Sequence, residues 1–228
     1  MDLGAVKQAP ARELARGSCG AANNARCLVE DAELLSGAGR LARAYSLAGL
    51  AIEEVGKAGS LAALAAMPES LRARAPVGRM LEWHQMKLIG GQLIAAVPFS
   101  SPALASKLMV MPLGEIAEIL DKAQAFAADM DRLKQRGLYV DVDRSGQVRV
   151  PSEVTAAEVR EQLDRARRAA SGVNALLDPS APPQLANPGA VAVEFSFAMV
   201  SALSETRFAR RPRVAADLLL KTVTRLQG

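Results

Sequence analysis

The sequence has few of the features that mark a secreted, membrane-spanning or β-rich protein. Only 4% of its 228 residues are aromatic, and no run of about 18 uncharged apolar residues could cross a membrane. The N-terminus lacks the basic-then-apolar order of a signal peptide. Cys19 and Cys27 are the only cysteines, and on one helix they would stand about 12 Å apart along its axis, too far for a disulfide. We therefore expect a cytoplasmic protein that does not associate with a membrane and keeps its cysteines reduced.

Motifs for metals, nucleotides and common cofactors are also absent. With one histidine and two separated cysteines, the chain cannot supply a ferritin-like set of carboxylate and histidine ligands. It contains no Walker-type loop, no G-x-S-x-G and no G-x-G-x-x-G. The net charge of +4 permits a nucleic-acid partner without requiring one, because clustered arginines also form solvated helix faces. We expect a protein with no metal and no cofactor.

The residues that are abundant indicate an all-α fold. Half of the chain is apolar, and much of that half is alanine and leucine, which favours closely packed helices. Apolar residues recur at helical spacing over residues 12–35, and the Ser-Gly-Ala-Gly turn that follows leads into a second helix over residues 40–66. Two long helices joined by a short glycine turn predict an antiparallel hairpin. Further helices are expected over residues 77–97 and 115–136, which completes a four-helix bundle.

The C-terminal part of the chain continues this bundle in the prediction. Residues 137–151 alternate in steps of two around a turn signal, which predicts a small β-hairpin or an extended excursion. Thr155 and Glu158 form a capping-box pattern that opens a polar helix ending near residue 174. A proline-rich loop over residues 178–188 and two final helices, 191–209 and 213–227, follow. We expect one domain, in which residues 1–151 form the bundle and residues 152–228 a C-terminal helical extension packed on it.

A charged notch interrupts the second expected helix, which is otherwise apolar nearly all round and is therefore predicted to be central. The notch consists of Glu53, Glu54 and Lys57. In one interpretation Glu53 and Lys57, spaced i,i+4, form an ordinary surface pair. In the other, Glu54 and Lys57 face a polar pocket shared with the third helix, because a charge desolvated without a partner costs several kcal/mol.

His84, the single histidine, is the second candidate for chemistry. It falls between Leu81 and Leu88 on the stripe that is predicted to face inward, and Lys87 follows one turn later. A lone histidine on an apolar face can be a hydrogen-bonded core residue. Alternatively, Glu54 accepts a hydrogen bond from His84 and orients the imidazole for acid–base work. We predict this Glu54–His84 pair because neighbouring helices with inward polar residues usually satisfy one another.

Three blocks of sequence, in this order and spacing, resemble the AbiV-type abortive-infection family, whose members belong to the HEPN superfamily of helical domains. The resemblance covers roughly residues 20–151. It rests on Asn24, Asp31 to Leu35, Arg43 to Ala48, Ile52 to Ala58, then His84 with Lys87, and finally Lys134, Arg136 and Gly137 to Asp141. It implies a HEPN-like antiparallel four-helix bundle, a tendency to form homodimers, and a role in bacterial defence against phage.

The resemblance also implies a reaction, because many relatives in the superfamily are metal-independent endoribonucleases with an Arg-x(4-6)-His motif. In that motif arginine binds the scissile phosphate and histidine moves protons at the attacking 2′-hydroxyl. Arg79 and His84 fit this spacing. The first hypothesis is therefore an RNA-cleaving or RNA-binding effector, in which His84 is the acid–base group, Arg79 and Lys87 contact phosphate, and Glu54 orients His84.

Two other functions stay open. The chain can be a non-catalytic defence protein that binds a phage or host protein and uses the charged notch only to fix helix packing. It can also be a sensor of a small ligand. The pocket of such a sensor would be lined by Glu54, Lys57, Tyr139 and Asp141. The complete set of candidate binding residues is Glu53, Lys57, Lys87, Lys134, Arg136, Tyr139 and Asp141.

Overall fold

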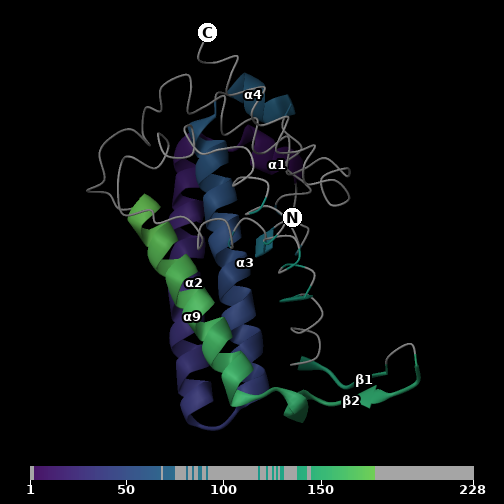
Figure 1. Ribbon diagram of the computed structural model, residues 1–228. Helices are drawn as coiled ribbons and strands as arrows, with labels where there is room; N and C mark the ends of the chain where they lie inside the picture. Colours follow the sequence, from purple (N-terminus) through teal and green to yellow (C-terminus); the bar gives the residue numbers. More distant parts are fainter. Residues whose placement is uncertain are drawn as a thin grey trace.

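The computed structural model describes residues 3–67, 69–74, 81, 84, 87–88, 91, 118, 122, 125, 127, 129–130, 138–142 and 145–177. This part of the chain is all-α apart from two short strands, and its helices pack together around one main core (Figure 1). They include α2, α3 and α9 and the helix that contains residues 81, 84, 87, 88 and 91. The helices expected over residues 191–209 and 213–227, and the loop over residues 178–188, lie outside the described residues.

The first two long helices form the predicted antiparallel hairpin. Helix α2 spans Ala11–Gly37 and α3 spans Leu41–Ala66. Pro10 precedes α2 with a φ of −56°, which suits a helix start. The chain reverses at Gly39, whose φ of +73° is a left-handed conformation that glycine adopts without strain. The face of α2 that meets the core is built largely from alanines, so the two backbones can approach closely. Its buried apolar residues are Leu14, Ala21, Ala22, Ala25, Val29 and Ala32.

Helix α3 is the central element of the bundle, as predicted from its apolar surface. It packs against both α2 and α9 (Figure 1). Its residues in the main core are Ala44, Tyr45, Ala48, Ala51, Ile52, Val55 and Ala58. Leu88, Ala127 and Met130, which belong to other helical stretches, complete this core around α3.

Helix α9, which spans Ala156–Leu177, closes the core from a third side. The predicted capping box is confirmed: the Thr155 amide donates to Glu158 Oε2 at 2.7 Å, and the Glu158 amide donates to Thr155 Oγ1 at 3.3 Å. Although α9 is polar in composition, a stripe at helical spacing is buried and consists of Val159, Leu163, Ala166, Ala170 and Val173. On its outer side, Arg167 Nε lies 2.6 Å from Glu33 Oε1 of α2.

Two short helices at one end of the bundle were not predicted. Helix α1 spans Leu3–Gln8 and α4 spans Glu69–Arg74. They dock on one another, since Lys7 Nζ donates to the Ala73 carbonyl at 3.1 Å and Arg72 Nη1 donates to the Ala9 carbonyl at 2.6 Å. Six residues are too few to show a helical period in the sequence, so these helices depend on tertiary contacts.

Residues 141–149 form a small antiparallel ladder. Strand β1 (Asp141–Val142) pairs with β2 (Val148–Arg149), in the register Asp141 to Arg149 and Val142 to Val148. The ladder extends away from the helices near the end of the bundle where α9 begins (Figure 1). A 3₁₀ turn, η1 (Pro151–Glu153), joins β2 to α9. No helix among the described residues has the length and apolarity that a membrane span requires.

Candidate acid–base site

Two glycines bring α3 into backbone contact with the helix around residues 81–91. A Cβ atom on Gly56 would lie 1.9 Å from the carbonyl oxygen of Lys87. A Cβ atom on Gly91 would lie 2.2 Å from the carbonyl oxygen of Ile52. Neither distance is sterically possible, so only glycine allows this crossing. The crossing fixes which side chains of the two helices can meet.

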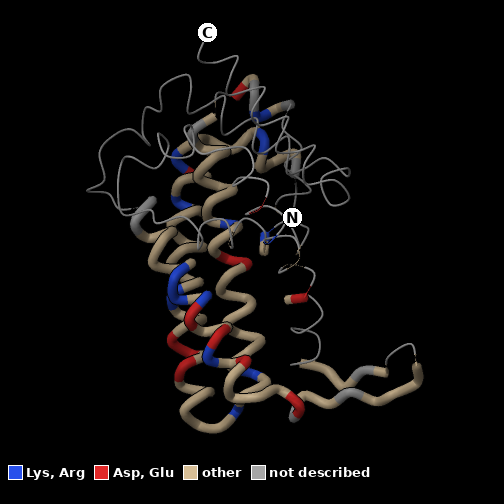
Figure 2. The backbone as a smooth tube through the Cα atoms, in the orientation of Figure 1, with Lys and Arg blue, Asp and Glu red and all other residues tan. Residues whose placement is uncertain are grey.

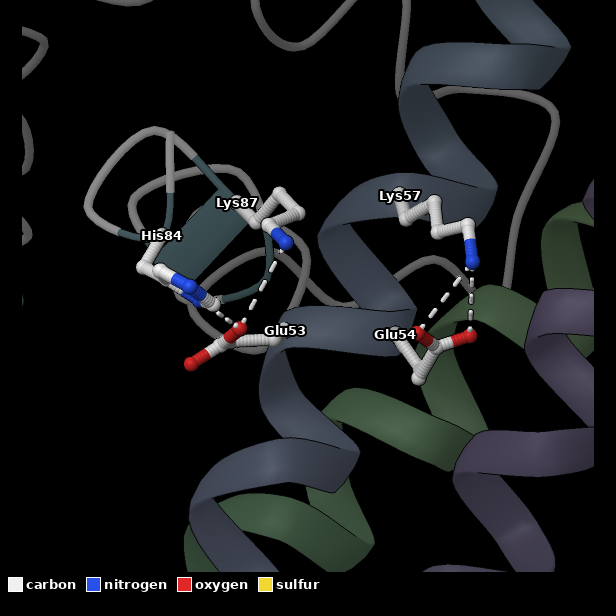
Figure 3. Close-up of polar contacts among 5 residues, drawn as sticks. All are labelled: Glu53, Glu54, Lys57, His84 and Lys87. Atoms are coloured by element: carbon white, nitrogen blue, oxygen red, sulfur yellow. Dashed lines mark hydrogen bonds and ion pairs between the residues drawn. The ribbon is translucent and has the colours of Figure 1, made fainter. Parts of the chain in front are cut away.

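Glu53 is buried at this crossing and contacts two basic side chains. It lies one turn before Gly56 and is only 3% exposed. Its Oε2 atom is 2.6 Å from His84 Nδ1 and 3.6 Å from Lys87 Nζ (Figure 3). A carboxylate in such a position is expensive to desolvate unless it is paired and hydrogen-bonded, and these two contacts offset that cost.

His84 lies at the edge of the helix interface and not within it. The side chains of Leu81 and Leu88 are buried, but that of His84 is 57% exposed. The prediction of an inward-facing histidine was therefore wrong. The His84 ring lies at the edge of the interface between its helix and α3, where it contacts Glu53. When the carboxylate is ionised, Nδ1 carries the proton that is shared with it, which leaves Nε2 as the nitrogen that can exchange a proton with another molecule.

The predicted Glu54–His84 pair was also wrong. Glu54 instead accepts from Lys57 Nζ, at 3.3 Å through Oε1 and 3.5 Å through Oε2. Figure 3 shows this pair on a different side of α3 from His84 and Lys87. Adjacent residues of a helix point about 100° apart, so Glu53 and Glu54 cannot both face the same neighbour. The expected i,i+4 pair of Glu53 with Lys57 is replaced by the i,i+3 pair of Glu54 with Lys57.

The remaining candidate residues are not brought to this site by the described contacts. Arg79, Lys134 and Arg136 lie outside the described residues. Tyr139 is exposed and lies two residues before the start of β1, where Asp141 pairs with Arg149. Because this ladder extends away from the bundle (Figure 1), the described structure does not assemble the sensor pocket expected from Glu54, Lys57, Tyr139 and Asp141. Within the described ranges, no group of three or more His, Cys, Asp or Glu residues could hold a metal ion.

A second set of polar groups lies in the core and serves packing. Tyr45 Oη donates to Met130 Sδ at 3.5 Å, and burial raises the pKa of Tyr45 to about 12. Gln162 is buried nearby, and a Cβ atom on Gly49 would lie 2.7 Å from Met130 Cε and 3.9 Å from Gln162 Nε2. Met130 therefore packs directly on the backbone of α3 at Gly49.

Basic and acidic residues are interspersed along the described helices in the view of Figure 2. Several of them form surface pairs, including Arg26 with Glu30 on α2 and Arg165 with Glu161 on α9. Pairs of this kind contribute little to stability. The cluster of Glu53 with its two basic partners differs from these surface pairs because its carboxylate is buried.

Sequence reasoning named Glu53 as a candidate binding residue but not as the partner of His84, and it missed the two glycines that position this pair, Gly56 and Gly91. A signal for them was present, because Gly56 stands three residues after Glu53 and therefore on the same side of α3. A glycine in the middle of a helix is unfavourable by roughly 0.5–1 kcal/mol relative to alanine. Its presence marks a place where another backbone approaches closely.

Comparison with known families places the chain in one of them. The family model for AbiV, a HEPN domain, matches residues 13–171, which is more than half of the chain and runs from α2 into α9. The chain therefore belongs to the AbiV family of HEPN domains, as its sequence blocks predicted. Membership in this family implies a role in abortive infection, a form of defence against phage. No curated protein and no solved structure matches the chain.

The extent of the match bears on the C-terminal part of the bundle. It passes residue 151 and includes most of α9, the helix that shares one core with α2 and α3. The sequence resemblance was placed only as far as residue 151. The division into a bundle and a C-terminal extension stays a prediction, since residues 178–228 lie outside the described part.

Proposed function

We propose that this AbiV-family protein acts in phage defence as a metal-independent endoribonuclease whose acid–base group is His84. The observation that supports this most directly is the 2.6 Å contact of a buried carboxylate oxygen of Glu53 with Nδ1 of an imidazole that is itself more than half exposed. A carboxylate behind a histidine sets its tautomer and orientation and leaves the opposite nitrogen facing outward.

The proposed reaction needs only proton transfer and charge stabilisation. His84 Nε2 removes the proton of a ribose 2′-hydroxyl, and that oxygen attacks the adjacent phosphorus. The bond from phosphorus to the 5′-oxygen of the next nucleotide breaks, which yields a 2′,3′-cyclic phosphate. The leaving oxygen takes up a proton from water, and His84 releases the proton on Nε2 to solvent. Positioned acid–base groups contribute roughly 10²- to 10⁴-fold in rate to such steps.

The other residues take supporting roles in this proposal. Glu53 is a positioning residue because it acts through His84. Lys87 Nζ is held 3.6 Å from Glu53 Oε2 and is mostly buried, so its first role is to balance the carboxylate. Arg79, five residues before His84 in the sequence, is proposed to contact the scissile phosphate, because its fork of donors suits phosphate oxygens.

A phage-protection assay tests the proposal in cells. Strains would carry the wild type, His84→Ala, or Glu54→Gln as a matched control on the other side of α3. We expect His84→Ala to stay folded, to lose protection against phage and to leave cellular RNA intact during infection. Glu54→Gln should behave as the wild type. Full protection by a folded His84→Ala protein would overturn the nuclease assignment.

A second candidate function is defence by binding a phage or host protein, without catalysis. It is favoured by the burial of Glu53 and by the Gly56–Gly91 crossing, because a carboxylate held by two basic side chains also serves to fix helix packing. In that case His84→Ala keeps its protection against phage. Glu53→Gln would lower stability in either case, so it does not separate the two functions.

A further inference from the structure

Helices α1 and α4 cap one another at the end of the bundle opposite the β-ladder (Figure 1). Lys7, in the last turn of α1, donates to the Ala73 carbonyl of α4 at 3.1 Å. Arg72, in the last turn of α4, donates at 2.6 Å to the carbonyl of Ala9, which follows α1. The last carbonyls of a helix have no partner within it and attract cations. Each helix thus supplies the basic side chain that binds the C-terminal end of the other.

This mutual capping makes the two helices depend on one another. Helices of six residues are not stable in water on their own. Among the described elements, α1 packs chiefly on α4, and α4 packs chiefly on α1. If either helix is lost, the other loses both its cap and its main packing surface. The pair of α1 and α4, which we call the clasp, is therefore expected to form and to open as one unit.

The environment of Arg72 makes the clasp less stable than the long helices. The residue is only 6% exposed, and its Nε atom is buried without a hydrogen-bond partner. The acceptor of its Nη1 atom, the carbonyl of Ala9, carries no charge. A buried cation is unfavourable unless an opposite charge and a full set of hydrogen bonds compensate it. We therefore expect the clasp to open before α2, α3 and α9 do.

The clasp covers a second apolar cluster that reaches the helix of His84. Val6 and Ala9 pack against this cluster, whose buried members are Leu14, Leu64, Met67 and Leu81. Leu81 precedes His84 by three residues, whereas Leu88, one turn after His84, belongs to the main core. The turns on either side of His84 are thus held by two different clusters, and the clasp covers one of them.

We propose that the clasp is a conformational switch for the position of His84. In the closed clasp, Leu81 is anchored in the second cluster and the imidazole meets Glu53 Oε2 at 2.6 Å. When the clasp opens, Val6 and its neighbours leave the cluster, the Leu81 end of the helix loosens, and the contact with Glu53 is lost. The close approach at Gly56 keeps the other end of that helix against α3. This inference goes beyond the proposed nuclease activity and does not depend on it.

Hydrogen exchange of the wild-type protein tests whether the clasp opens as one unit. We expect the amides of α1 and α4 to report one common free energy of opening, well below that of α3, and to respond equally to small additions of urea. Two conditions would overturn the proposal. One is a different free energy of opening for α1 and α4, and the other is protection of α4 that equals the protection of α3.

NMR tests the effect of the clasp on the site, because His84 is the only histidine and every imidazole signal belongs to it. The hydrogen bond to Glu53 fixes the proton on Nδ1, and a ring released from Glu53 loses that preference. Val6→Asp places a charge in the apolar contact of α1. We expect this variant to speed amide exchange in α4 by roughly ten-fold or more. We also expect it to move the nitrogen signals of His84 toward a mixture of the two tautomers.

Two further variants make the outcome specific. Ala5→Asp adds the same charge at an exposed position of α1 and should leave exchange and tautomer as in the wild type. Lys7→Met removes the cap on Ala73 without placing a charge in the cluster, and it should speed exchange in α1 as well as in α4. Faster exchange in α4 alone would overturn the coupling of the two helices. If Val6→Asp opens α4 while the signals of His84 stay as in the wild type, the clasp does not control His84 and the proposal fails.

Discussion

Glu53 and His84, 31 residues apart in the chain, meet through Oε2 and Nδ1 at 2.6 Å. The carboxylate belongs to the central helix and is buried, whereas the imidazole leans over it from the edge of the neighbouring helix. This relationship depends on Gly56 and Gly91, which let the two backbones touch. Burying the Glu53 carboxylate without a partner would be costly. Paired with Nδ1 of His84, it holds the imidazole so that Nε2 faces solvent.

The two adjacent glutamates of α3 should differ sharply in their effect on stability. Glu53→Gln removes the negative charge between His84 and Lys87, and we expect it to lower the free energy of unfolding by about 2–3 kcal/mol. Glu54→Gln removes only a partly exposed pair with Lys57 and should change it by less than about 1 kcal/mol. Urea denaturation of both variants measures the difference. Equal effects would show that Glu53 is not the buried partner.

The close crossing of α3 with the helix around residues 81–91 leads to a second prediction. In Gly56→Ala the new methyl group meets the Lys87 carbonyl, so the helices must separate, and we expect a loss of about 3 kcal/mol or more. Gly20→Ala is the control, because that glycine lies in α2 with nothing within 4 Å of its added Cβ. Alanine there should stabilise the protein by roughly 0.5–1 kcal/mol. Thermal unfolding of Gly56→Ala and Gly20→Ala measures the expected loss and the expected gain of stability. A Gly56→Ala protein as stable as the wild type would contradict the close approach of the two helices.

Much of the helical framework was predictable because it rests on local rules. The period of apolar residues located α2 and α3 to within two residues, and the Thr155–Glu158 pattern located the start of α9. Docking of α1 on α4 was not predictable, since six-residue helices show no period. That Arg72 is buried and bound to a distant carbonyl follows from this docking and not from its own neighbours in sequence.

The sequence identified the charged residues of the site, but it did not determine which glutamate contacts His84. The notch on α3 and the lone histidine were identified from the sequence, yet choosing between Glu53 and Glu54 requires knowing from which side the next helix approaches. A rotation of about 100° separates the two carboxylates, and the apolar pattern of a helix buried nearly all round does not fix that direction. Gly56 does, because a glycine three residues after Glu53 marks the side of closest contact.

Tyr45 should make stability depend on pH in the alkaline range. Its pKa is raised to about 12 in the folded state, mainly by burial, whereas an unfolded tyrosine titrates near 10. Between these values the unfolded state releases a proton that the folded state keeps, so stability falls as the pH rises from about 10 to 12. The loss is on the order of 2 kcal/mol. Tyr45→Phe lacks this group, so its stability relative to the wild type should improve over that range; parallel curves for the two proteins would contradict the shift.

The capping box of α9 offers a test of local structure. Thr155→Ala removes the hydroxyl that accepts from the Glu158 amide, and we expect a loss of about 1 kcal/mol. Thr155→Ser keeps the hydroxyl and should recover most of that loss. Chemical denaturation of the two variants provides the comparison. If serine and alanine prove equally destabilising, the hydroxyl does not cap the helix.

RNA cleavage by the purified protein in the presence of EDTA tests the central claim most directly. The wild type, His84→Ala and Glu54→Gln would be incubated with an RNA oligonucleotide and with the same sequence made of deoxyribonucleotides. The account predicts that the wild type and Glu54→Gln cleave only the RNA and leave cyclic phosphate ends, and that folded His84→Ala is at least 100-fold slower. Cleavage by His84→Ala at the wild-type rate, or cleavage of the deoxyribonucleotide substrate, would contradict it.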